Sequence, residues 1–150
     1  MNNTKNTCVA EDDKVTKGSC LCGDVHYELH GNLGIFQYCH CSRCRKFTGS
    51  AHGANLFVAP GDFKWISGEN KTGRFEHPDA KHFATSFCLR CGSSLPWLTK
   101  SGKAMVVPAG SLDDDPGIEP TQNIYSASRA SWYQSVESLV CYDTLPDKSK

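Results

Sequence analysis

Residues 18–29 read GSCLCGDVHYEL, and this stretch joins a close pair of cysteines to a short strand. Cys20 and Cys22 are separated by one residue, and Gly23 follows them directly. Apolar and polar residues then alternate through residues 24–29, the period of two that is typical of a half-buried strand. The stretch therefore predicts a thiol-bearing turn that leads straight into a sheet.

A second close pair, Cys88 and Cys91, is followed by Gly92 in the same way. Thiolates so spaced on a turn can converge on one cation, and structural zinc is held by four ligands in a tetrahedron. A glycine after each pair suits a tight turn whose N–H groups point at the sulfurs. We therefore expect a structural zinc on Cys20, Cys22, Cys88 and Cys91. The alternative is a set of buried free thiols.

The middle of the chain carries a third cluster, CHCSRC at 39–44, with thiols at Cys39, Cys41 and Cys44. Zinc bound by three protein ligands keeps a position for water or substrate, as catalytic sites do. Three thiolates on a divalent ion leave a net charge of about −1, which disfavours hydroxide formation and favours a soft sulfur ligand. We expect a catalytic, exchangeable zinc here, with a small thiol as substrate.

Three basic residues, Arg43, Arg45 and Lys46, stand within or just after this cluster. They are our candidates for substrate binding, because they can offset the negative charge or grip carboxylates on the carrier of the thiol. The alternative interpretation is a solvated charged face.

Other side chains leave the coordination open to alternatives. If His40 or Cys141 were the fourth ligand, the middle site would be closed and structural; His40 is otherwise a neighbour of the ligands or a surface residue. Iron–sulfur ligation fits the four-plus-three split of thiols less simply than zinc. Cys8 has no assigned role, and four other histidines are expected to be structural: His26, on the polar side of a strand, and His52, His77 and His82, whose spacing does not implicate a metal.

Composition narrows the class of protein. The 150 residues contain 16 basic and 16 acidic side chains, so the chain lacks the broad positive field of a nonspecific nucleic-acid or membrane binder. Nine cysteines without an apolar signal segment favour metal ligation over disulfides and predict a soluble, cytoplasmic protein. Nothing in the composition specifies an oligomeric state.

The chain divides into a flexible N-terminal tail at 1–17, a zinc-binding domain at 18–146 and a C-terminal tail at 147–150. Short β-branched and aromatic runs separated by turn residues predict a mainly β domain with little helix. Strands are expected near 25–29, 54–58, 63–66, 82–87, 104–110 and 123–128, and short helices at 42–48 and 131–138.

Four blocks in register resemble the glutathione-dependent formaldehyde-activating enzyme family, also known as the centromere protein V/GFA domain. They are GSCLCGDVHYEL (18–29), CHCSRCRKFTGS (39–50), FCLRCGSSLPW (87–97) and GSLDDDPGIEPTQNIYSASRASW (110–132). The resemblance implies a mainly β fold called the β-tent, with a structural zinc and an exchangeable zinc on the two cysteine sets named above. Relatives often carry a histidine where this chain has Asn123.

The resemblance also implies an activity, the joining of glutathione and formaldehyde into S-(hydroxymethyl)glutathione, which is a carbon–sulfur lyase reaction when written in reverse. Ser50, Asn55, Trp97 and the 110–115 loop are candidate pocket residues, or else turn-formers and core aromatics. The first rival function is a noncatalytic, zinc-stabilised binding module. The second is a zinc-ribbon nucleic-acid binder, which the absence of a basic excess disfavours.

Overall fold

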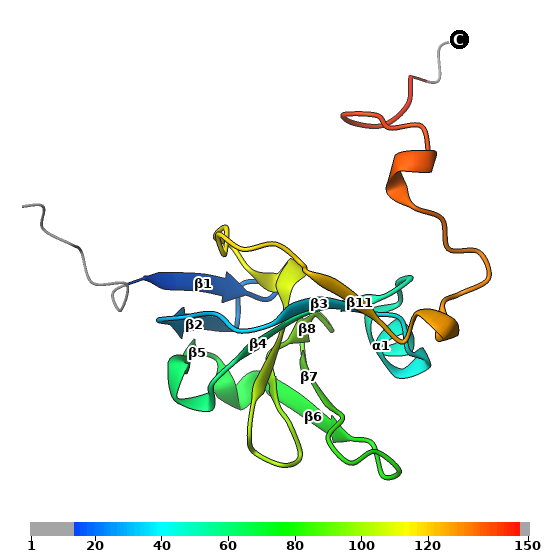
Figure 1. Ribbon diagram of the computed structural model, residues 1–150. Helices are drawn as coiled ribbons and strands as arrows, with labels where there is room; N and C mark the ends of the chain where they lie inside the picture. The colour runs from blue at the N-terminus through cyan, green and yellow to red at the C-terminus, as the bar shows by residue number, and fades with distance from the viewer. Residues whose placement is uncertain (1–13, 148–150) are drawn as a thin grey trace, which may run out of the picture.

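Short strands build three small sheets in the computed structural model, which describes residues 14–147 (Figure 1). The first sheet has the order β1-β2-β5, with β1 at Val15–Ser19, β2 at His26–His30 and β5 at Phe63–Ser67. The second has the order β11-β3-β4-β10-β9, with bounds Gln122–Ile124, Phe36–Cys39, Gly53–Val58, Met105–Pro108 and Trp97–Leu98. The third has the order β6-β7-β8, with bounds Thr72–Glu76, Ala84–Cys88 and Ser94–Leu95.

Neighbouring strands are antiparallel except for β11, which runs parallel to β3 and places Ile124 opposite Cys39. Helix α1 (Ser42–Thr48) leaves the end of β3 after a two-residue corner. Single 3₁₀ turns lie at Pro60–Asp62, Glu69–Lys71, Ala109–Ser111, Ser126–Ser128 and Val136–Ser138. The end of β3 is therefore held by strands on both sides before the chain turns into the helix.

The main core lies where the first two sheets face each other. Tyr27 and Leu29 project from β2, and Leu56 and Val107 come from β4 and β10; each is at most 1% exposed. A separate, smaller apolar cluster is formed around Trp97. The alternation along β2 is thus explained by one face that packs against the second sheet.

The mainly β fold with short-strand sheets is confirmed, and so is the helix expected at 42–48. The helix expected at 131–138 is wrong: only the 3₁₀ turn at 136–138 forms there. These residues are almost all exposed, so no packed face stabilises a helix of that length.

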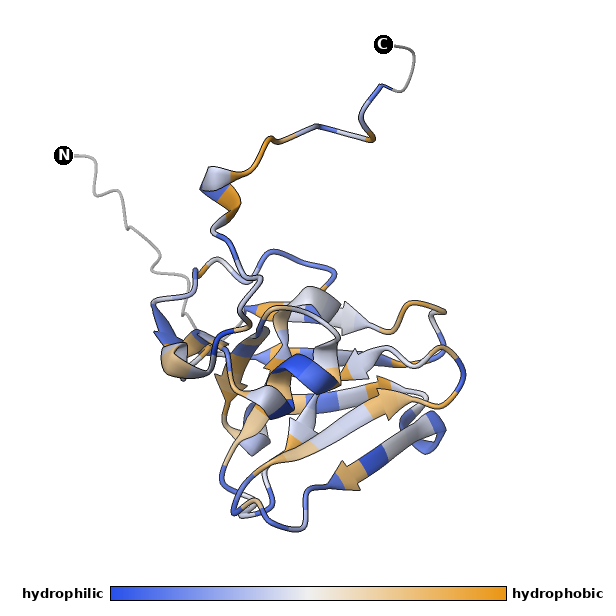
Figure 2. Ribbon diagram, turned by 90° about the vertical axis from the view of Figure 1, so that its right-hand side faces the viewer, coloured by the Kyte–Doolittle hydropathy of each residue, from blue (hydrophilic) through white to orange (hydrophobic). Residues whose placement is uncertain are grey.

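The ends of the packed region differ from the expected boundaries. Residues 15–17, expected in a tail, belong to β1. Residues 134–147 are exposed throughout and lead away from the sheets, carrying a mixture of apolar and polar residues (Figures 1 and 2). The other parts of the predicted tails, 1–13 and 148–150, lie outside the described residues. Over residues 14–147, no helix has the length and apolar character needed to cross a membrane.

One hydrogen-bonded chain ties β2 to the loop after β10. The Ser111 hydroxyl donates to the Pro108 carbonyl at 2.7 Å, so its oxygen is left to accept from the Tyr27 hydroxyl, also at 2.7 Å. Tyr27 is 1% exposed, and this burial raises the pKa of its phenol. Both hydroxyl groups therefore stay protonated and paired.

We predict that Ser111→Ala lowers the free energy of unfolding more than Tyr27→Phe does. The alanine leaves the buried Tyr27 hydroxyl and the Pro108 carbonyl without a partner, at a cost of about 1–3 kcal/mol, whereas the phenylalanine removes one donor, at about 0.5–1.5 kcal/mol. Urea denaturation measures both, with Ser50→Ala, an exposed position, as the neutral control. A larger loss for Tyr27→Phe would contradict the assigned direction of donation.

Candidate metal centres and cavity

Two pairs of thiols meet between the first and third sheets. Cys20 and Cys22 lie in the turn between β1 and β2, and Cys88 and Cys91 flank the turn between β7 and β8. The four Sγ atoms lie within 4.8 Å of one another. Cys20 and Cys88 are almost fully buried, at 3% and 1% exposed, while their partners are half-buried. Four convergent thiols form a donor set compatible with zinc.

Both turns have the same backbone form. Gly23 and Gly92 adopt φ angles of 79° and 73°, in the left-handed region that glycine tolerates best. Their N–H groups donate to the carbonyls of Cys20 and Cys88 at 3.0 and 2.9 Å. The glycines expected after each pair are thus required by the turn that aims the two sulfurs.

Hydrogen bonds also favour the thiolate form of two members of this cluster, Cys20 and Cys91. The Ser93 hydroxyl, helped by the Ser93 N–H, lowers the pKa of Cys91 to about 5. The Val25 N–H donates to the Cys20 sulfur at 3.3 Å. Such donors favour thiolates, the form in which cysteine binds a metal.

The second cluster is built at the corner between β3 and α1. Cys39 ends the strand, and Cys41 caps the helix, with its sulfur accepting the Cys44 N–H at 3.4 Å. Cys44 is on the first turn of the helix, so the same cap that starts α1 brings the thiols together. All three sulfurs lie within 4.8 Å of one another.

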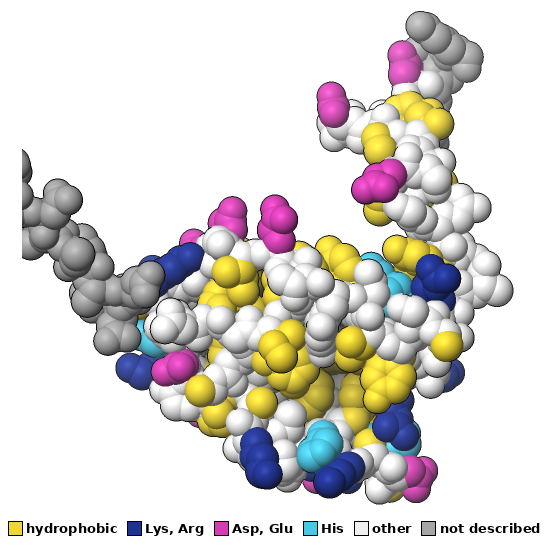
Figure 3. Space-filling model, viewed as in Figure 1, with side chains coloured by type: hydrophobic (Ala, Val, Ile, Leu, Met, Phe, Trp, Pro, Cys, Tyr) yellow, Lys and Arg dark blue, Asp and Glu magenta, His cyan; other side chains and the backbone are white. Residues whose placement is uncertain are grey.

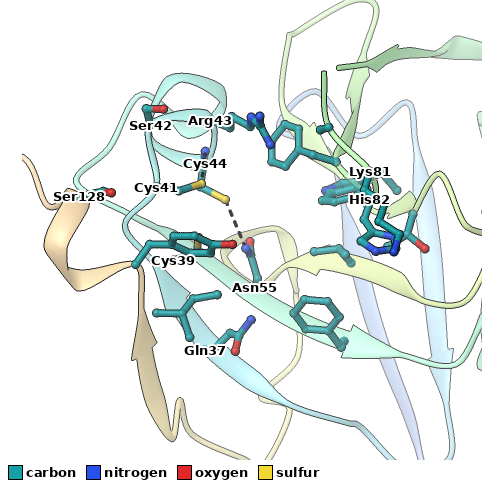
Figure 4. Close-up of a pocket in the computed structure, with 18 residues that line it drawn as sticks. Gln37, Cys39, Cys41, Ser42, Arg43, Cys44, Asn55, Lys81, His82 and Ser128 are labelled. Atoms are coloured by element: carbon teal, nitrogen blue, oxygen red, sulfur yellow. Dashed lines mark hydrogen bonds between the residues drawn. The ribbon is translucent and has the colours of Figure 1, made fainter. Parts of the chain in front are cut away.

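The pKa values of the thiols in this cluster are compatible with metal binding. A hydrogen bond from the Cys44 thiol lowers the pKa of Cys39 to about 6, while that bond and burial raise the pKa of Cys44. The Asn55 amide donates to the Cys44 sulfur at 3.6 Å (Figure 4). A metal bound by three thiolates has to displace the remaining protons, so its affinity rises with pH.

Within residues 14–147, neither suggested fourth ligand joins the three thiols. The His40 Nε2 atom pairs with the Asn123 side-chain oxygen at 2.9 Å, and the ring packs against His52 and Tyr133 with centroids 5.2 and 5.3 Å away. Cys141 is exposed in the C-terminal stretch. Cys8 lies outside the described residues. Of the described side chains that commonly bind metals, only the three cysteines gather here.

The three thiols open onto a cavity of about 580 Å³. Small-molecule sites commonly measure about 300–1,000 Å³, so the cavity has room for a tripeptide-sized ligand. Apolar side chains of the smaller core cluster line it, among them Phe57, Phe83 and Trp97. On the face of the molecule seen in Figure 3, hydrophobic side chains gather in the middle, and basic and histidine side chains lie along the lower margin.

The basic side chains at the cavity come from two elements. Arg43 reaches from α1, and Lys81 and His82 lie across the opening on the loop between β6 and β7 (Figure 4). Arg45 points elsewhere, donating to the His40 carbonyl at 3.3 Å, and Lys46 does not line the cavity. The expected basic cluster is therefore divided, with Arg43 alone facing the cavity.

Among the other candidates, Asn55 and Trp97 line the cavity, whereas Ser50 and the 110–115 loop do not. The loop lies instead beside the four-thiol cluster, where Asp113 accepts from the Ser19 hydroxyl at 2.9 Å. His82, which was expected to be structural, lies on the cavity wall. Lys81 and His82 were missed because no spacing links their loop to the cysteines.

Lys100 fixes the loop that carries Lys81 and His82. Its Nζ atom donates to the carbonyls of His77 and Ala80 at 2.9 and 2.7 Å, and its N–H donates to the His82 carbonyl at 3.1 Å. Lys100 follows β9, a strand of the second sheet. The second sheet therefore fixes the position of the loop between β6 and β7, which belongs to the third sheet.

Comparison with known proteins gives the family. Residues 15–128 match the family described as glutathione-dependent formaldehyde-activating enzyme. The chain belongs to this family. A Halomonas elongata protein, whose name provisionally assigns it glutathione-dependent formaldehyde activation, is 26% identical over 145 residues that cover 89% of this chain and 90% of the relative.

A solved structure supports the fold of this family member. The crystal structure of a Rhodobacter sphaeroides protein superposes with a TM-score of 0.55 at 23% identity, covering 71% of this chain and 98% of that one. The match agrees with the mainly β architecture described above.

We predict different outcomes for serine substitutions in the two clusters. Cys88→Ser removes a buried thiol from the cluster that joins two sheets, so the protein should lose its fold if that cluster holds a metal. Cys41→Ser should stay folded, because a serine hydroxyl also caps a helix, and should bind one metal ion fewer than the unaltered protein if the three-thiol cluster holds one. Metal stoichiometry and circular dichroism measure both. A folded, metal-free Cys88→Ser variant would show that the four-thiol cluster is not what holds the sheets.

We predict that Lys100→Met loosens the loop between β6 and β7. Losing an ammonium that donates to two carbonyls should lower the free energy of unfolding by about 1–3 kcal/mol. Trypsin should then cleave faster after Lys81. Lys103→Met, exposed on the same hairpin, is the matched control for charge. Equal protection of Lys81 in the two variants would show that Lys100 does not anchor the loop.

Proposed function

We propose that this protein joins the thiol of glutathione to formaldehyde, forming S-(hydroxymethyl)glutathione, and catalyses the reverse carbon–sulfur cleavage. In the forward direction the glutathione sulfur forms a bond to the carbonyl carbon. The C=O π electrons become an alkoxide, which takes up the proton that the thiol has lost. No oxidant or reductant is needed, so the reaction is a balanced addition.

The proposal rests on one observation. The three-thiol cluster, which no fourth metal-binding side chain among the described residues joins, lies at the wall of a ligand-sized cavity. We propose that Cys39, Cys41 and Cys44 hold a catalytic zinc, and that Cys20, Cys22, Cys88 and Cys91 hold a structural one. When bound at the three-thiol cluster, zinc supplies a coordination position for a soft sulfur ligand and favours its thiolate. Membership of the family and the name of the Halomonas relative support glutathione and formaldehyde as the reactants.

The basic side chains at the cavity suit the two carboxylates of glutathione. The Arg43 guanidinium can bind one carboxylate through paired N–H donors, and the Lys81 ammonium can bind the other as a point charge. Because they stand on different elements, they can hold the ligand at both ends. We assign Arg43 and Lys81 to substrate binding. Arg45 and Lys46 instead belong to the charged face around helix α1.

His82 and the apolar wall have separate roles. An imidazole at the cavity can accept the thiol proton and return it to the developing alkoxide. Phe57, Phe83 and Trp97 exclude water from the reacting atoms and so strengthen the electrostatic contacts of the bound ligand. We further propose a cytoplasmic location, because a reducing compartment keeps the seven clustered thiols free for metal.

We predict that glutathione binds the zinc-loaded protein saturably in calorimetric titration. S-methylglutathione, which keeps the charges and size but lacks a free thiol, should bind at least about tenfold more weakly if the sulfur is held at the cluster. Cys41→Ser should abolish the difference between the two ligands, and Lys81→Met should weaken both. Equal binding of the two ligands to the unaltered protein would remove the thiol cluster from recognition and favour the binding-module rival.

The catalytic step is tested separately. The protein should accelerate exchange between formaldehyde hydrate and S-(hydroxymethyl)glutathione at equilibrium, as followed by exchange NMR against the uncatalysed rate. His82→Gln should slow exchange while leaving glutathione affinity within about twofold. A folded, zinc-loaded protein that binds glutathione without changing the exchange rate would refute the enzymatic proposal.

A further inference from the structure

Tyr125 has a backbone conformation that its side chain disfavours. Its φ and ψ angles are 54° and 38°, and over residues 14–147 it is the one residue other than glycine with a positive φ. A bulky side chain in this left-handed region is unusual, since Cβ crowds the following carbonyl. The conformation therefore needs a reason in the surrounding structure or in the function.

The backbone around Tyr125 explains how this conformation is maintained. Ile124 ends β11 opposite Cys39, and its carbonyl accepts the His40 N–H at 3.0 Å. The Tyr125 carbonyl then accepts the Ser128 N–H at 2.9 Å and closes a turn. The chain thus reverses immediately beside the strand that carries the first thiol.

Side-chain packing does not compensate for the backbone strain at Tyr125. Tyr125 is 64% exposed, and among the described residues its hydroxyl has no hydrogen-bond partner and its ring has no aromatic neighbour. Burial of aromatic surface, the usual benefit of a tyrosine, is largely missing here. Local strain that brings no packing is characteristic of functional positions.

The strained residue lies at the three-thiol cavity. Tyr125 lines that cavity together with Cys39, Cys41 and the Ser128 that closes its turn. An exposed ring at such a rim offers a flat face and a hydroxyl to a ligand whose sulfur lies at the thiols. Arg43 and Lys81 provide charge at the cavity but no aromatic ring.

We infer that Tyr125 determines specificity in this cavity by packing its ring against the amide-containing chain of a peptide thiol. The inference rests on the proposed function, because it takes the sulfur of the ligand to the three-thiol cluster. The ring selects thiols carried on an extended peptide over small thiols that reach the cluster without touching it. The left-handed backbone is retained because it directs the ring to the rim.

Tyr125→Gly separates this role from a structural one. Glycine accepts the same φ angle without strain, so the thermal unfolding midpoint should stay within about 2 °C or rise. The affinity for glutathione, by calorimetry on the zinc-loaded protein, should fall about five- to tenfold with loss of the ring contact. The affinity for 2-mercaptoethanol, which lacks a peptide chain, should change less than about twofold. Tyr125→Phe keeps the ring and should retain most of the glutathione affinity.

The outcomes distinguish this inference from the proposal beneath it. If the unaltered protein binds no glutathione, the proposed function fails and the inference with it. If the unaltered protein binds glutathione and Tyr125→Gly binds it equally well, the inference alone is overturned. A lower unfolding midpoint for Tyr125→Gly with unchanged affinity would show that the tyrosine serves the fold.

Discussion

The convergence of two thiol pairs between the first and third sheets is the constraint on which the remaining geometry depends. Cys20 and Cys22 come from the turn after β1, Cys88 ends β7, and Cys91 lies in the turn after it. The sheets are small, and short antiparallel strands hold together weakly unless something joins them. Four sulfurs within 4.8 Å supply that joint when a cation balances their charge. Because Cys88 ends β7, the same junction also determines the position of the loop between β6 and β7, which faces the second cluster.

The two walls of the cavity are held by different means. Cys39 stands at the end of a strand paired on both sides, and Cys41 follows as a helix cap, so the thiol wall belongs to rigid secondary structure. The opposite wall includes a loop that is held by the Lys100 ammonium and by backbone hydrogen bonds. Binding sites on regular elements are held more tightly than sites on loops. The cavity therefore has one side built on regular secondary structure and one side built on a loop that Lys100 helps to anchor.

Much of the fold and of both thiol clusters could be predicted because their signals are local. Alternation along 25–29 predicted the strand that packs the core, and the cysteine spacing with its glycines predicted both clusters. The spacing could not show that Lys81 and His82 face the thiols, because that meeting depends on the packing of separate sheets. Nor does a tyrosine in a sequence signal a positive φ angle; Tyr125 adopts one directly after Ile124, where the pairing of β11 with β3 ends.

Two expectations failed where the sequence pattern was read without its environment. Residues 131–138 carry enough apolar side chains for a helix, yet no surface is present for that face to pack against, and the chain remains exposed. Conversely, residues 15–17 look like a polar tail but pair along β2, because backbone hydrogen bonds of a strand do not require apolar side chains.

The four-thiol joint also has a consequence for how the molecule is made. Its two halves are separated by 66 residues from Cys22 to Cys88, and the three-thiol cluster lies inside the loop that they close. During synthesis from the N-terminus, that loop can close once Cys91 leaves the ribosome. The strands and turn that finish the cavity, β9 to Tyr125, emerge only afterwards. For that interval Cys39, Cys41 and Cys44 stand uncovered, so early capture of metal would shield them from oxidation before the cavity is complete.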